Sequence, residues 1–206
     1  MTFDPRQQLI EAATLFYAKN WMSGTAGNLS ARLNDNSFWI TASGKNKGEL
    51  TQQDFIRIAL DGTILEQPTP DIKPSAETSI HQAIYTAFPE AKACYHVHSI
   101  EANLVSRFTE KNTLTLPPIE MLKGLGIWEE NPHIEMPLFD NHFHVPNIAA
   151  EITQNFASTP PKIPVLLIRN HGVTVWANST TTARNYIEII EYIFRYMISA
   201  RQLNLA

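Results

Sequence analysis

Two of the seven histidines, His96 and His98, stand two positions apart directly after the run AKACY at 91–95. Residues i and i+2 of an extended strand project from the same face, so this spacing directs both imidazoles to one side. Imidazole nitrogens are common zinc ligands, and the single cysteine, Cys94, excludes a site built from several cysteines. The pair is therefore a candidate for two ligands of a metal ion.

A second pair with the same spacing, His142 and His144, has different neighbours. Turn-forming residues flank it on both sides, with Asp and Asn at 140–141 and Pro and Asn at 146–147. This composition is typical of an irregular surface segment, which would not hold two ligands rigidly. We therefore predict that the second pair does not bind metal.

A third ligand is suggested by His171, which lies between two predicted strands and precedes Gly172. Glycine lets the backbone turn at a strand end and bring a side chain into a cleft. Taken alone, a histidine at such a position is more often a loop or core residue than a metal ligand. Three imidazoles would leave one coordination position for water or substrate, as in catalytic zinc sites.

Two stretches of small and polar residues could bind a phosphate group, GTAGN at 24–28 and ASG at 42–44. Small residues let backbone N–H groups approach an anion closely, and the hydroxyl and amide side chains add donors. The nucleotide-binding patterns GxxxxGK[ST] and GxGxxG do not occur in the sequence. We therefore predict a small phosphorylated substrate whose phosphate is bound at a distance from the metal ligands.

Glu77 and Glu120 are the candidates for general acid–base catalysis. Proton transfer beside a metal ion needs a side chain that can cycle between charged and neutral forms. Glu77 begins a predicted helix, where a carboxylate also interacts favourably with the positive end of the helix. Exposed glutamates without a catalytic role are common, so residue type alone leaves both assignments open.

The elements that must position these residues alternate along the chain. Apolar spacing predicts helices over 5–19, 75–88, from about 99, over 148–156 and over 179–202. Short β-branched or aromatic runs predict strands over 29–33, 38–41, 55–60, 63–65, 92–97, 163–169 and 173–177. The region 116–146 is broken by prolines. This order predicts an α/β sandwich, and the hairpins favour a mixed, largely antiparallel sheet.

Length and charge limit the class of protein. A chain of 206 residues is typical of one domain, spanning 1–206, with a substantial core. The net charge of -4 and the lack of a basic cluster argue against nucleic acid as a partner. No apolar run is long enough to span a bilayer, and the N-terminus lacks the pattern of a signal peptide. We therefore expect a cytoplasmic protein.

Five motifs in order, GTAGNLS, TASGKNK, KPSAET, YHVHS and RNHGVTVWA, resemble the class II aldolase family of zinc-dependent fuculose-phosphate and ribulose-phosphate enzymes. The resemblance extends over about 5–203. It implies a three-layer αβα domain, a homotetramer, and Zn²⁺ bound by His96, His98 and His171. It also implies a set of residues around the substrate phosphate, namely Thr25, Asn28, Ser43, Gly44 and Ser75.

One further stretch, PIEMLKG at 118–124, is similar to an E-M-[IL]-K-G motif of sugar-phosphate dehydratases within this family. The resemblance implies that Glu120 is the proton carrier. The aldolases of the family use instead a glutamate at the position of Glu77, and this sequence has both. We favour Glu120 as the principal acid–base residue, with Glu77 supporting catalysis or contacting substrate. Ala76 replaces a second serine that several aldolases carry.

Two alternatives to a dehydratase remain at this point. An aldolase that cleaves a ketose 1-phosphate would use the same metal, the same phosphate site and the same type of intermediate. An adducin-like domain would keep the fold as a non-catalytic interaction module. Retention of all three histidines and of both glutamates argues against the second alternative.

Overall fold

One open sheet of nine strands forms the centre of the computed structural model, which describes residues 4–205. The strand order is β4-β3-β2-β1-β5-β9-β8-β7-β6, and every neighbouring pair is antiparallel except the parallel pair β7 and β8. The strands are β1 (Asn28–Arg32), β2 (Ser37–Thr41), β3 (Phe55–Ala59), β4 (Ile64–Glu66), β5 (Ala93–Val97), β6 (Thr113–Leu116), β7 (Ile134–Phe139), β8 (Val165–Ile168) and β9 (Gly172–Ala177). The predicted mixed, largely antiparallel sheet is confirmed.

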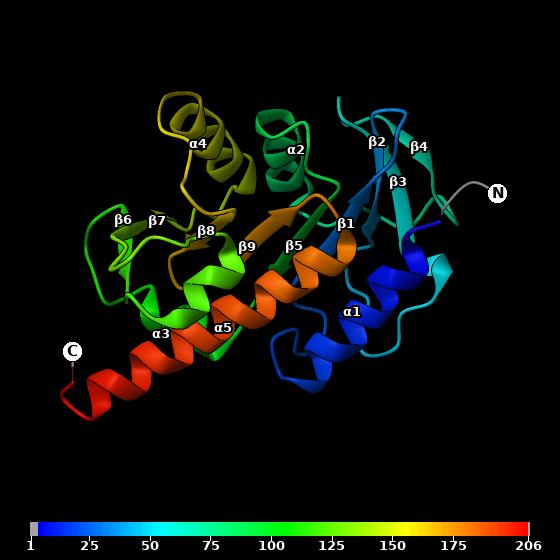
Figure 1. The fold of residues 1–206 in the computed structure, drawn as a ribbon. Coiled ribbons are helices and arrows are strands. Elements are labelled where there is room, and N and C mark those ends of the chain that lie inside the picture. Colours follow the sequence, from blue (N-terminus) through cyan, green and yellow to red (C-terminus); the bar gives the residue numbers. More distant parts are fainter. Residues whose placement is uncertain (1–3, 206) are drawn as a thin grey trace.

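Helices cover both faces of this sheet (Figure 1). One layer consists of α1 (Arg6–Ala18), α3 (Ile100–Val105) and α5 (Thr180–Gln202), and the opposite layer of α2 (Thr78–Ala87) and α4 (Val145–Ser158). Two short 3-10 helices, η1 (Gln52–Asp54) and η2 (Glu120–Leu125), lie in connections. Each helical layer buries its own apolar core against the sheet, which confirms the predicted αβα sandwich. No helix within residues 4–205 is long and apolar enough to cross a membrane.

The sequence patterns did not predict β6 and β7, at the far edge of the sheet. The prolines between 116 and 146 argue against strands, yet Pro137 lies inside β7. It pairs with Thr113 of β6, while the parallel ladder to β8 begins only at Leu138. The missing N–H of Pro137 therefore removes no hydrogen bond from that ladder, as is usual for proline near a sheet edge. The predicted domain range, 1–206, includes residues 1–3 and 206, which lie outside the described residues.

The alternating direction of side chains along β5 determines which face of the sheet His96 points to. Tyr95 and Val97 pack in the core under α1 and α5, whereas Cys94 packs in the core under α2 and α4. Successive strand residues face opposite sides, so His96 faces the α2 and α4 layer, as Cys94 does. The tertiary fold thus directs the metal-binding candidate toward the beginning of α2.

Glu191 is a buried carboxylate on α5, away from these residues. It is only 2% exposed, and neither carboxylate oxygen accepts a hydrogen bond from the described residues. Burial raises the pKa of Glu191 to about 8, an effect that the nearby Ser99 hydroxyl opposes and Glu101 reinforces. The folded chain therefore holds this proton over a pH range in which the unfolded chain has released it.

We expect Glu191→Gln to stabilise the protein at neutral pH. A carboxyl group whose pKa is raised on folding contributes its full stability when the pH is below the pKa of the unfolded state. This stability is lost as the pH rises through the pKa of the folded state. Glutamine keeps the shape of the side chain but has no proton to lose. The free energy of unfolding of the variant should therefore exceed that of the wild type by an amount that grows between pH 5 and 8 and reaches about 3 kcal/mol. Urea unfolding at several pH values measures this difference. Glu188→Gln, on a partly exposed position of the same helix, is the control; an equal gain there would contradict the prediction.

Candidate metal centre and active site

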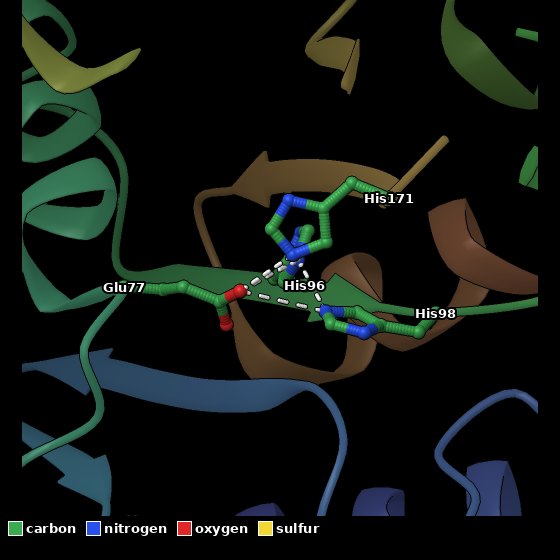
Figure 2. Close-up of side chains that lie close together, drawn as sticks. All are labelled: Glu77, His96, His98 and His171. Atoms are coloured by element: carbon green, nitrogen blue, oxygen red, sulfur yellow. Dashed lines mark hydrogen bonds and ion pairs between the residues drawn. The ribbon is translucent and has the colours of Figure 1, made fainter. Parts of the chain in front are cut away.

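Four side chains from separate parts of the fold meet at the end of β5: Glu77, His96, His98 and His171 (Figure 2). Their ligand atoms all lie within 4.8 Å of one another. The Nε2 atom of His96 lies 2.8 Å from that of His98 and 3.4 Å from that of His171. Oε1 of Glu77 lies 2.6 Å from Nε2 of His171. The structure thus brings the three predicted ligands together and adds Glu77 to them.

The turn between β8 and β9 carries His171, and Gly172 follows it. A Cβ atom on Gly172 would lie 2.2 Å from the carbonyl oxygen of Val97 and 3.1 Å from the ring of His96. The left-handed backbone of this turn belongs to Asn170, with φ of 51°, and not to the glycine. The sequence interpretation of Gly172 as the turning residue was therefore wrong: glycine is needed here because β9 packs closely against the end of β5.

The cluster fits a divalent metal ion by its donor atoms and spacing. Metal–nitrogen bonds of about 2.0–2.1 Å in a tetrahedral site separate neighbouring ligand atoms by about 3.3 Å. The two Nε2 separations from His96 bracket this value. Nδ1 of His96 lies 2.8 Å from the hydroxyl oxygen of Thr174, which can accept its N–H and leave Nε2 free to coordinate. The structure therefore supports a metal-binding group made of imidazoles and one carboxylate.

Electrostatics favour the charge states that metal binding needs. Burial lowers the pKa of His96 well below its usual range, which keeps the ring neutral. Burial of Glu77 favours the neutral acid, but the facing imidazoles, His96 foremost, hold its pKa well below the usual range. Neutral imidazoles and an ionised carboxylate are the ligand forms that bind a cation.

The predicted phosphate-binding residues lie on three segments that the structure ties together. Ala42 and Pro74 form an isolated bridge between two of these segments, and the Ser43 N–H donates to the Lys73 carbonyl at 2.9 Å. Gly44 has φ of 71°, a backbone conformation that favours glycine. The segments around 24–28, 43–44 and 75 therefore meet near the beginning of α2, and they carry Thr25, Asn28, Ser43, Gly44 and Ser75.

Lys47 joins the first two of these segments, and the sequence analysis did not single it out. Its ammonium is buried and donates to the carbonyl oxygens of Thr25 at 2.7 Å and Lys45 at 2.9 Å. Among the described residues, no carboxylate forms an ion pair with it. Burial lowers the pKa of Lys47 to about 8, with Glu77 opposing, so the group carries positive charge at neutral pH.

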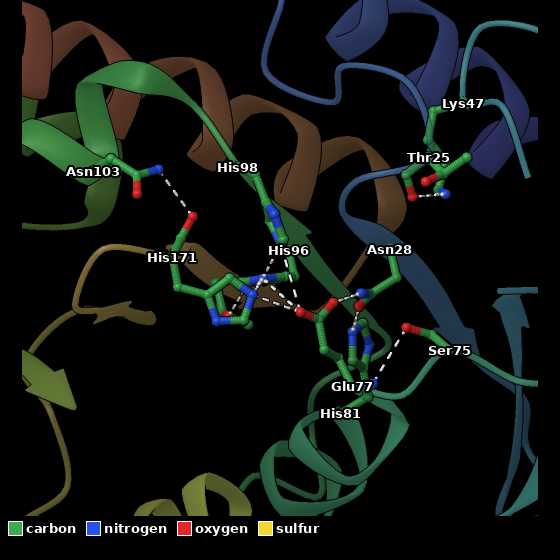
Figure 3. A network of polar contacts seen from close by, with 11 residues as sticks. Thr25, Asn28, Lys47, Ser75, Glu77, His81, His96, His98, Asn103 and His171 are labelled. Atoms are coloured by element: carbon green, nitrogen blue, oxygen red, sulfur yellow. Dashed lines mark hydrogen bonds and ion pairs between the residues drawn. The ribbon is translucent and has the colours of Figure 1, made fainter. Parts of the chain in front are cut away.

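Asn28 connects the segments that carry the predicted phosphate-binding residues to the cluster of Glu77 and the three histidines (Figure 3). It pairs with His96 across β1 and β5, and its amide nitrogen donates to Oε2 of Glu77. The prediction that the phosphate residues lie at a distance from the metal ligands is wrong for Asn28, because the antiparallel register places it beside His96. The amide oxygen of Asn28 contacts His81, a second residue that the sequence analysis missed. The available signal was its position, one helical turn after Glu77.

Glu120 is not brought to this cluster within one chain. It lies at the start of η2 with its side chain 82% exposed, and its carboxylate pairs with Lys123 at 2.7 Å. It faces outward, whereas the Glu77 side chain is 13% exposed and lies against the histidines. Glu77 is the N-cap residue of α2, but its side chain makes no capping hydrogen bond, because it is turned toward the cluster.

The second histidine pair lies elsewhere. His142 pairs with Glu151 of α4 at 2.7 Å, and His144 is the N-cap residue of that helix. Within residues 4–205, the one group of nearby ligand-type residues that could hold a metal ion is the cluster at the end of β5. The flanking turn residues thus distinguish two pairs of identical spacing.

Comparison with known proteins gives a consistent result. Residues 7–198 match the family described as Class II Aldolase and Adducin N-terminal domain. Methylthioribulose-1-phosphate dehydratase from Microcystis aeruginosa is 62% identical over 200 residues, covering 97% of this chain and 98% of that protein. The protein of the same name from Leptospira biflexa is 45% identical over 199 residues, covering 93% and 95%.

Solved structures match the fold. L-fuculose-1-phosphate aldolase from Thermus thermophilus superposes with a TM-score of 0.77 at 22% identity, covering 97% of this chain and 95% of that one. At this identity the similarity concerns the architecture alone.

Proposed function

This chain belongs to the class II aldolase and adducin N-terminal domain family, and from that premise we propose that it removes water from 5-methylthioribulose 1-phosphate to give 2,3-diketo-5-methylthiopentyl 1-phosphate. The enzyme is then a hydro-lyase of methionine salvage, acting as a cytoplasmic homotetramer. The observation that carries the proposal is the contact between the metal-binding cluster and the segments with the predicted phosphate-binding residues. Asn28 links the metal-binding cluster to the phosphate segments, so one small substrate can occupy both.

Three imidazoles, those of His96, His98 and His171, are the proposed ligands of Zn²⁺. Such an ion supplies Lewis-acid stabilisation of negative charge on a substrate oxygen, which removal of the C3 proton generates. The protein's own contribution is a set of three nitrogen donors held by β5 and the β8–β9 turn. Thr174 fixes the orientation of one of these rings.

In this proposal two carboxylates, those of Glu77 and Glu120, each carry out one proton transfer. Removal of the C3 proton requires a base beside the cluster, and Glu77 is placed there in its ionised form. Departure of the C4 hydroxyl requires a proton on its oxygen, which we assign to Glu120. Ketonisation of the resulting enol completes the reaction. Since Glu120 points outward from its own chain, it would serve the site of a neighbouring subunit of the tetramer.

Substrate turnover tests the proposal directly. Purified protein is incubated with methylthioribulose 1-phosphate and with a panel of ketose 1-phosphates that includes fuculose 1-phosphate. Formation of the diketone from the first compound alone is expected. Products of C3–C4 cleavage would identify the chain as an aldolase instead, and absence of any turnover by the metal-loaded protein would favour the adducin-like interaction module.

Lys47 provides a prediction about the phosphate. Replacement by methionine removes a buried positive charge that has no carboxylate partner, and we expect KM for the phosphorylated substrate to rise roughly 10-fold or more. Metal content should not change. Lys45→Met is the matched control, because that ammonium already pairs with Asp54 at 3.0 Å. Loss of metal in the Lys47 variant, or an equal effect in the control, would contradict a role in phosphate binding.

A further inference from the structure

A chain of buried hydrogen bonds runs from the core under α2 to the metal-binding cluster, and Figure 3 shows its last part, from His81 through Asn28 to Glu77. The hydroxyl oxygen of Ser30 lies 2.7 Å from the Tyr85 hydroxyl and 2.7 Å from Nδ1 of His81. The other ring nitrogen of His81 contacts the amide oxygen of Asn28, whose nitrogen contacts Glu77. Four of the five residues are at most 1% exposed, so solvent cannot replace these partners.

The chemistry of the groups fixes the direction of every bond in this chain. The amide nitrogen of Asn28 faces Oε2 of Glu77 and donates a hydrogen bond to that carboxyl oxygen. The amide oxygen of Asn28 then faces His81 and must accept, which requires a proton on Nε2 of His81. The alternative amide orientation would place two oxygen atoms against each other at Glu77.

The remaining bonds follow from the neutrality of the ring. His81 is fully buried, and burial lowers its pKa to about 4, with Glu77 opposing. A neutral imidazole with its proton on Nε2 has a free lone pair on Nδ1, so the Ser30 hydroxyl donates to it at 2.7 Å, a shorter contact than the 3.3 Å to the carbonyl oxygen of Cys94. Ser30 accepts in turn from Tyr85. All donors therefore point along the chain toward Glu77.

We propose that His81 is a positioning residue for the reaction: its Nε2–H fixes the amide of Asn28 in the orientation that holds Glu77 against the three histidines. The position of His81 on α2 suits this role, because residues four apart lie on the same face of a helix and Glu77 directly precedes that helix. The inference rests on the proposed function for its kinetic consequence. It does not need that function for its statement about the tautomer and the amide.

Two substitutions of His81 separate positioning from packing. The amide nitrogen of glutamine can occupy the place of Nε2 and donate to Asn28, whereas the shorter asparagine reaches only the place of Nδ1. We expect His81→Gln to keep kcat within a few-fold of wild type and His81→Asn to lose roughly 10- to 100-fold, through misplacement of Glu77. Metal content should stay the same in both. Thr86→Ala, at an exposed position of the same helix and outside this chain of bonds, should leave kcat unchanged.

A role in packing alone would give a different result, because both variants remove the ring from the same buried position. Equal losses of kcat in His81→Gln and His81→Asn, in parallel with equal losses of thermal stability, would overturn the inference. Wild-type kcat in His81→Asn would overturn it as well.

The tautomer gives a readout that does not depend on activity. In protein labelled with ¹⁵N-histidine, the His81 ring should show a protonated Nε2 and an unprotonated Nδ1 at neutral pH. The opposite tautomer would overturn the inference even if both variants failed to fold. A wild-type protein that does not dehydrate methylthioribulose 1-phosphate but shows the expected tautomer would instead refute the proposed function and leave the orientation of Asn28 intact.

Discussion

The variants His171→Ala and His96→Ala should each lose the bound metal. Their turnover of the substrate should fall to the background rate. Wild-type protein should contain about one divalent ion per chain, because three imidazoles form a site with one open position. Removing one ring leaves two nitrogen donors, and a buried site with an incomplete ligand set no longer competes with water for the ion. Elemental analysis after gel filtration measures the metal, and diketone formation measures turnover.

The second histidine pair supplies the matched control for this experiment. The double change His142→Ala and His144→Ala removes two imidazoles of the same sequence spacing, which lie at α4 and outside the cluster. It should retain the metal and most of the activity. Loss of metal in the double variant, together with retention in His171→Ala, would show that the cluster at the end of β5 is not the metal site.

Conversion of each glutamate to glutamine should stop turnover at a different step. Glutamine keeps the size and hydrogen bonding of the side chain but carries no proton, so we expect a loss of roughly 10²–10⁴-fold in each case. Glu120→Gln should keep the metal and still exchange the C3 hydrogen of the substrate with deuterium from solvent. Glu77→Gln should lose this exchange, because the proposal assigns the base to this carboxylate, which lies beside the cluster.

Either glutamate assignment can fail separately. Near-normal turnover in Glu120→Gln, with none in Glu77→Gln, would leave Glu77 as the sole acid–base residue, as in the aldolases. Loss of exchange in Glu120→Gln would assign the first proton transfer to that residue instead.

Mixed oligomers test the proposal that Glu120 acts on a neighbouring subunit. Co-expression of the Glu77→Gln and Glu120→Gln chains should restore activity to roughly a quarter of the sites, since random pairing across a symmetric interface unites both intact glutamates that often. Neither variant is active alone in this scheme. Failure to recover activity in verified mixed oligomers would contradict action between subunits.

The sequence by itself determined the parts of this site that depend on local geometry. The spacing of His96 and His98 at the end of an apolar run was enough to place both rings on one side, because side-chain direction in a strand alternates residue by residue. Flanking turn residues were enough to separate this pair from His142 and His144. Hairpin signals likewise predicted the antiparallel sheet, since a tight turn fixes the pairing of its two strands.

Only the tertiary structure decided which distant groups join those histidines. The beginning of α2 lies near the end of β5 because β1 pairs with β5 and α2 packs on that face, so Glu77 meets the cluster while Glu120 faces outward. His81 and Lys47 are unremarkable in sequence, and their roles come from burial beside particular partners. The register between distant strands and the burial of single side chains depend on the whole sheet and its two cores. Local patterns of residues therefore do not predict them.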